Sequence, residues 1–200
     1  MGGTEVRATV TGPRQDHQKS GTNKDRGTIE TGFFISPFAP VDRKNSSRFD
    51  KRSKETQALL IHLFESIVIL DQLPRSSIQI NITVIDSDGS LQAATINAAV
   101  LALVSAGIPM KSLVSACEVS LIDDEILLDP TQDETYFASG TLLTGHVTHS
   151  NDIALMESTG QIPHDTLTSM LAQAHQGCEQ ITDFMEKALQ TYAESLSGVR

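Results

Sequence analysis

The sequence contains no tryptophan, only two tyrosines and only two cysteines. Aromatic residues make up 4% of the chain, which argues against a surface that stacks many nucleic-acid bases. Cys117 and Cys178 lie in apolar stretches outside any Cys-x-x-Cys motif, so we predict buried structural thiols and a reducing compartment. No apolar run reaches the roughly eighteen residues of a membrane span, and the N-terminus has no signal-peptide core. We therefore expect a protein of the cytoplasm or nucleus with no membrane contact.

Several motifs of nucleotide, metal and hydrolase chemistry are also absent, namely GxxxxGK[ST], GxGxxG, HExxH and GxSxG. The six histidines are scattered along the chain. His146 and His149 are three residues apart. They would lie on opposite faces of a strand, or else within a turn. We favour structural roles for these histidines over a metal site, and we predict no metal and no other cofactor.

Positive charge is scarce overall and concentrated in one place. The chain carries 25 Asp and Glu against 15 Lys and Arg, a formal charge of -10, which disfavours non-specific nucleic-acid binding. Six cations lie within twelve residues: Arg43, Lys44, Arg48, Lys51, Arg52 and Lys54. A solvated face is the simplest explanation, but cations are unfavourable just before a helix. The stretch therefore predicts an anionic contact, either a nucleic-acid backbone or an acidic protein surface.

Hydrophobic periodicity predicts an α+β chain, or a mixed α/β layer, that forms one domain over residues 1–200. Alternation at period two is clearest in 73–86, and a helix apolar on most faces is expected within 87–107. The expected strands cover 5–12, 27–38, 73–86, two segments of 112–129, 135–148 and 151–158. The expected helices cover 55–70, part of 87–107, and the chain from His164, with Asp165 near its start.

Two polar segments carry alternatives. The turn "DSDGS", which ends at Ser90, could cradle a phosphate at a helix N-terminus, but we favour a plain turn in which Ser90 caps the helix. The segment "LLDPTQDETY" offers Asp129 with Asp133 and Glu134 as paired carboxylates, but a solvated loop is the favoured interpretation. Asn97, inside the apolar helix, is expected to be buried and hydrogen-bonded for packing.

Five segments, taken in order, resemble the RNase PH family. They are "GPRQ", "SPFAPVDRKNSSRFDKRSKETQ", "LPRSSIQINITVIDSDGS", "AATINAAVLALVSAGIPM" and "LLDPTQDE". The resemblance covers nearly the whole chain, and the polar, basic run is similar to the exosome branch of the family. It implies a fold like domain 2 of ribosomal protein S5, with a mixed β-sheet packed with α-helices. Family members begin some tens of residues earlier, so the chain looks N-terminally shortened.

Active members of this family degrade RNA from its 3′ end by phosphorolysis. This reaction needs cations to neutralise the phosphate and carboxylates to bind a metal ion or transfer a proton. The resemblance places Gln92 where active members hold a phosphate-binding arginine. Asp129 matches the first of two aspartates six residues apart, but Thr135 stands at the second. The segment 55–70 also lacks the further arginine of the bacterial enzymes. Three parts of the phosphorolytic site are thus degenerate.

The resemblance therefore implies a non-catalytic subunit of the exosome, a 3′–5′ exoribonuclease complex of the nucleus, nucleolus and cytoplasm that acts in rRNA processing and RNA degradation. Its partners would be other RNase PH-like subunits in a heterohexameric ring, cap proteins, a hydrolytic nuclease and RNA in the channel. The RNA-facing cations would be Lys51, Arg52 and Lys19, with Arg48 and Lys54 beside them. The alternatives are an active phosphate-dependent 3′–5′ exoribonuclease and an α+β interaction module unrelated to RNA.

Overall fold

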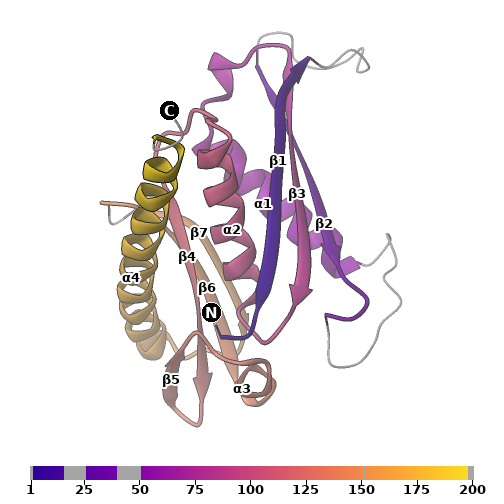
Figure 1. Ribbon diagram of the computed structural model, residues 1–200. Helices are drawn as coiled ribbons and strands as arrows, with labels where there is room; N and C mark the ends of the chain where they lie inside the picture. Colours follow the sequence, from indigo (N-terminus) through magenta and orange to yellow (C-terminus); the bar gives the residue numbers. More distant parts are fainter. Residues whose placement is uncertain (1, 16–25, 40–50, 151, 198–200) are drawn as a thin grey trace.

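The computed structural model describes residues 2–15, 26–39, 51–150 and 152–197, without the side chain of Arg52. Within these residues, seven strands and four α-helices follow in the order β1, β2, α1, β3, α2, β4, β5, α3, β6, β7 and α4. A short 3₁₀ helix, Leu70–Gln72, lies between α1 and β3. The α+β class expected from the sequence is confirmed, and the strands form two separate sheets (Figure 1).

The first sheet has the strand order β1 (Glu5–Gln15), β3 (Ser76–Asp86) and β2 (Thr28–Ile35). β1 runs antiparallel to β3, whereas β2 runs parallel to it. The sequence predicted that β1 ends at Gly12, but the strand continues to Gln15 through a register shift between Thr11 and Arg14. Gly12 and Pro13 stay unpaired at this shift. A proline has no N–H to donate to a regular ladder, so a shift accommodates it.

One face of this sheet is buried. In β3, Ile78, Ile80, Ile82 and Val84 are fully buried, while the alternate residues are exposed or half-buried. This confirms the period-two pattern expected from the sequence. The helices α1 (Lys51–Ile67) and α2 (Leu91–Ser105) contribute to the same apolar core as these β3 residues.

The second sheet is antiparallel throughout, in the order β5 (Glu125–Leu128), β4 (Val114–Ile122), β6 (Gly140–Val147) and β7 (Ile153–Gly160). α2 packs against β1 on one side and β4 on the other, so it lies between the two sheets (Figure 1). A helix in this position has little surface left for solvent, which accounts for its almost wholly apolar sequence.

The long helix α4 (His164–Ser197) covers the outer face of the second sheet (Figure 1). Met170 and Ala174 on α4 join Val119 and Leu142 of the sheet in a second apolar cluster. Asp165 lies in the first turn of α4, as predicted, where a carboxylate complements the helix dipole. Within the described residues, no helix has both the length and the apolar character needed to cross a membrane.

Two predicted boundaries are wrong. The segment expected to be a loop running into a strand at Thr135 contains a short helix, α3 (Gln132–Phe137), and β6 begins only at Gly140. A capping box starts α3: Glu134 N–H donates to Thr131 Oγ1, and Thr131 N–H donates to Glu134 Oε2 at 2.7 Å. In addition, α1 begins at Lys51 rather than Glu55, so part of the basic stretch lies inside the helix.

Candidate functional site

The turn before α2 is held in a conformation that few residues tolerate. Gly89 has φ +85° and Ser90 has φ +46°, both in the left-handed region. A Cβ atom at Gly89 would overlap the carbonyl oxygen of Pro130, so only glycine fits there. Ser90 Oγ donates to Pro130 O at 3.3 Å and makes no capping bond to α2, so the predicted side-chain cap is wrong.

This contact brings together the segments that carry three positions compared above with the phosphorolytic site, namely Gln92, Asp129 and Thr135. Gln92 is half-buried in the first turn of α2, directly after the Gly89–Ser90 turn. Asp129 precedes Pro130, has φ +57°, and donates its N–H to Glu118 O at 2.9 Å. Thr135 lies in α3, and its Oγ1 donates to Thr131 O at 2.8 Å, so its hydroxyl is engaged within its own helix.

Glu118 is a carboxyl group at this site that the sequence analysis missed. It lies on β4, and the N–H of Asp129 is bonded to its backbone. Burial, together with the nearby charges of Asp129 and Glu157, raises the pKa of Glu118 to about 7. The available signal was a single charged residue inside the apolar run of 113–122.

Asn97 fixes the distance between α2 and β4. Its Nδ2 donates to Ala116 O at 2.9 Å, and Ala116 N–H donates to Asn97 Oδ1 at 2.8 Å. The side-chain amide thus pairs with β4 as a neighbouring strand would. The predicted buried, hydrogen-bonded packing role is confirmed, and this pairing positions α2 beside Glu118.

The two halves of the chain differ sharply in charge. From Ser112 to Glu186 there are thirteen Asp and Glu and no Lys or Arg, whereas residues 1–111 carry eleven acidic and thirteen basic residues. The segment that contains Asp129 therefore supplies no Lys or Arg that could bind a phosphate. Carboxylates there oppose the approach of another anion.

The basic stretch is only partly described. Lys51 lies in the first turn of α1, its side chain is 91% exposed, and its Nζ is 3.7 Å from Glu55 Oε1. Lys54 is exposed on the same helix, and Arg52 belongs to that helix as well. Lys19 and Arg48 lie outside the described residues, so their RNA contacts, like those of Lys51, Arg52 and Lys54, stay predictions.

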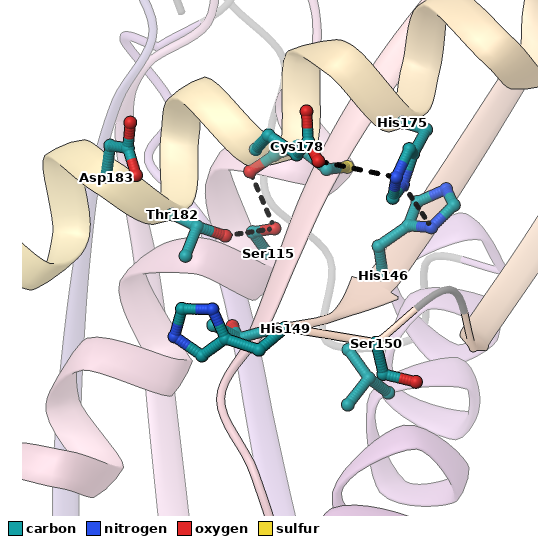
Figure 2. Close-up of a pocket in the computed structure, with 11 residues that line it drawn as sticks. Ser115, His146, His149, Ser150, His175, Cys178, Thr182 and Asp183 are labelled. Carbon is teal, nitrogen blue, oxygen red and sulfur yellow. Dashed lines mark hydrogen bonds and ion pairs between the residues drawn. The ribbon is translucent and has the colours of Figure 1, made fainter.

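A separate open pocket of about 680 Å³ lies between the end of β6 and α4 (Figure 2). His146 on β6 and His175 on α4 point toward one another there, with Nδ1 to Nδ1 at 3.2 Å. His175 Nε2 is 3.5 Å from Glu179 Oε1. His149 is in a turn after β6, and its Nε2 lies 3.2 Å from Glu186 Oε1.

The surroundings of His146 favour its neutral form. Burial lowers the pKa of His146, His175 lowers it further, and Glu179 acts in the opposite sense. His146 Nε2 is buried with no hydrogen-bond partner among the described residues, so a proton on it would lack an acceptor. In the part of the chain that the structure describes, no group of three or more His, Cys, Asp or Glu side chains could hold a metal ion.

The cysteines have the roles expected of structural thiols. Both Cys117 and Cys178 are free and buried. Burial raises the pKa of Cys117 to about 12 and also raises that of Cys178, so both stay protonated at neutral pH. A Cβ on Gly177 of α4 would lie 3.0 Å from Cys117 Sγ, which shows how closely α4 packs on β4.

The family assignment rests on matches along most of the chain. Residues 1–109 match domain 1 of the 3′ exoribonuclease family, RNase PH, and residues 112–177 match domain 2. The chain belongs to the RNase PH family. The candidate site lies where these two family regions meet, because the Gly89–Ser90 turn belongs to the first and the Pro130 segment to the second.

Curated relatives in the RNase PH family are exosome components. The Arabidopsis thaliana exosome complex component RRP41 homolog is 30% identical over 98% of this chain and 81% of its own length. Exosome complex component Rrp41 of Thermococcus onnurineus is 32% identical over 94% of this chain and 75% of its own. The crystal structure of rice Rrp46 superposes with a TM-score of 0.83 at 26% identity, covering 94% of this chain and 84% of that one. The RNase PH-like fold predicted from the sequence is thereby confirmed.

Proposed function

We propose that this RNase PH-like chain is a non-catalytic subunit of an exosome ring that contributes cations to the path of RNA. Membership of an exosome is supported by the names of its relatives, which are exosome components. Its partners would then be other RNase PH-like subunits in a ring, with cap proteins and a hydrolytic nuclease, in the nucleus, nucleolus and cytoplasm.

The observation that carries the non-catalytic role is the set of side chains around the Gly89–Ser90 turn. Phosphorolysis needs a charge-assisted grip on the attacking phosphate, and Gln92 is neutral. Glu118 adds a further carboxyl group beside Asp129, and Thr135, at the position of the second aspartate, bonds within its own helix. A site of this composition disfavours inorganic phosphate.

The experiment is a phosphorolysis assay on the protein alone and on the ring reconstituted with its partner subunits. We expect no nucleoside diphosphate release from RNA in phosphate buffer. Gln92→Arg alone should not restore activity, because groups that act as a unit are not rescued singly. Phosphate-dependent release that disappears in Asp129→Asn would overturn the proposal.

One observation favours the alternative of an active phosphorolytic enzyme. Glu118 has a pKa of about 7 beside Asp129, which is the range suited to proton transfer at neutral pH. If the alternative holds, nucleoside diphosphate release should depend on pH near 7 and should change its pH profile in Glu118→Gln. The same assay, run across this pH range, separates the two functions.

A further inference from the structure

The end of the molecule formed by α3 and the β4–β5 turn presents two aromatic rings to solvent. Tyr136 is 84% exposed and Phe137 is 73% exposed, and their rings form an edge-to-face pair with centroids 5.4 Å apart. Side chains of this size lose little conformational freedom on binding and are enriched in protein interfaces. An exposed aromatic pair in a chain with so few aromatics is a candidate contact surface.

Carboxylates lie at the same end of the molecule as this pair. Asp133 lies on α3, Asp123 and Asp124 form the β4–β5 turn, and Glu125 begins β5, all of them exposed. The two elements are joined at Ser139, whose N–H and Oγ both donate to Leu121 O, at 2.8 and 3.0 Å. Figure 1 shows α3 and the β4–β5 hairpin at the same end of the molecule. We call these residues the acidic–aromatic patch: Asp123, Asp124, Glu125, Asp133, Tyr136 and Phe137.

The charge of the patch determines what it can bind. Four exposed carboxylates share this end of the molecule with the two rings, and the segment from Ser112 to Glu186 contains no Lys or Arg to offset them. RNA bases could stack on the rings, but the phosphates would meet these carboxylates. A second copy of the chain that used the same patch would bring the same negative charge to the contact. A basic polypeptide has the complementary charge, and arginine also stacks on aromatic faces.

We propose that the acidic–aromatic patch docks an arginine-bearing segment of a partner protein. Guanidinium groups stack on Tyr136 and Phe137 and pair with the carboxylates of Asp123 and Asp133. This inference goes beyond the proposed RNA-channel function and does not depend on it, because it concerns side chains other than the cations of the basic stretch and another class of partner.

The test uses the purified full chain and a fluorescein-labelled peptide of alternating glycine and arginine, with binding measured by fluorescence anisotropy at low salt. Tyr136→Ser with Phe137→Ser should weaken binding roughly tenfold, as expected for the loss of two stacked cation–aromatic contacts. Phe184→Ser is the matched control, since Phe184 on α4 is also 73% exposed, and it should leave the affinity unchanged. A lysine-for-arginine peptide should bind less tightly than the arginine peptide.

A second pair of variants tests the charges without touching the rings. Asp123→Asn with Asp133→Asn should weaken peptide binding and reduce its salt dependence, while thermal unfolding stays unchanged because both residues are exposed. The proposal fails if the wild-type chain does not bind the peptide, or if the Phe184 variant loses as much affinity as the ring variants. It also fails if the Tyr136→Ser, Phe137→Ser variant loses affinity for poly(U) RNA and not for the peptide. A wild-type chain that is a dimer on gel filtration, with a monomeric variant, would likewise contradict the proposal.

Discussion

At the scale of single residues, Glu118 is the group most altered by its surroundings. Its pKa of about 7 lies above the ordinary value of 4.5. Between pH 4.5 and pH 7, Glu118 is therefore protonated in the folded chain and ionised in the unfolded chain. The stabilisation from this proton is complete below pH 4.5 and declines as the pH rises toward 7. Above that range the chain holds a half-buried carboxylate near Asp129 and Glu157.

Glu118→Gln should therefore stabilise the protein above pH 7 and leave it nearly unchanged near pH 4.5. Glutamine resembles the protonated acid in shape and cannot ionise. The gain in the free energy of unfolding above pH 7 should be at most about 3 kcal/mol, the equivalent of the shift in pKa. Urea unfolding of both proteins at the two pH values measures it.

Glu194→Gln on the exposed end of α4 is the control for replacing a surface carboxylate by an amide. His146 makes this comparison necessary, since its lowered pKa removes stability as the pH falls below 6.5, in the sense opposite to Glu118. A pH curve of the wild type alone would mix the two groups. Parallel curves for wild type and Glu118→Gln would show that Glu118 titrates as an ordinary surface acid.

At the scale of elements, α1 begins against the usual charge preference of helices. Its first turn holds Lys51 and Arg52 and no acidic residue, whereas the helix dipole favours negative charge there. Lys and Arg are good helix formers, which accounts for a start earlier than the sequence analysis predicted. The exposed pair of Lys51 with Glu55 adds little stability. A contact with an anion outside the helix offers a reason for cations at this end.

Lys51→Ala with Arg52→Ala should weaken RNA binding by the ring equally for any sequence, because phosphate contacts carry no sequence information. Each lost contact should reduce the salt slope of binding to single-stranded RNA by roughly 0.7. The unfolding midpoint should be unchanged or slightly higher, since two cations leave a helix N-terminus. Filter binding over a range of salt concentrations measures the slope, and Lys187→Ala on α4 is the matched control.

Reversal to glutamate separates RNA contact from subunit docking. Glutamate at both positions suits the start of a helix, so α1 should form as before. If the cations face RNA, the ring should assemble and bind RNA more weakly than the alanine variant does. A variant absent from the ring on gel filtration would indicate docking instead, and unchanged RNA affinity and salt slope in an assembled ring would contradict the channel assignment.

Elements with strong periodicity were predictable from the sequence, and short ones were not. β3 and α2 follow from their apolar patterns because one face, or nearly every face, is buried. α3 has six residues, too few to show a helical period, although its capping-box residues Thr131 and Glu134 were visible. The prediction that Ser90 caps α2 was wrong because its hydroxyl donates to the carbonyl oxygen of Pro130 instead.

The candidate site was predictable only through the family resemblance. No local pattern connects Gln92 to Asp129, since the contact between their segments is made by the fold. The pKa of Glu118 depends on Asp129 and on Glu157, which lies two strands away from it in the same sheet. Such properties belong to neighbours brought together from distant parts of the chain.

At the scale of the whole molecule, the charge is divided between the two family regions. The first 111 residues are slightly basic, and the segment from Ser112 to Glu186 is acidic throughout. The net charge of -10 therefore belongs almost entirely to the second sheet, α3 and α4. A molecule divided in this way has a preferred orientation toward a polyanion, with the acidic region turned away.

This division predicts where RNA contacts the chain in an assembled ring. RNA carrying 4-thiouridine should crosslink to peptides from residues 1–111 and not to peptides from 112–186, because the phosphates of a bound strand avoid a region without cations. Mass spectrometry of the crosslinked peptides measures this, and Lys51→Glu with Arg52→Glu should reduce the yield of the first group. Crosslinks within 129–137 that persist at high salt would contradict the prediction, since they would place RNA bases on α3 and beside Asp129 despite the carboxylates there.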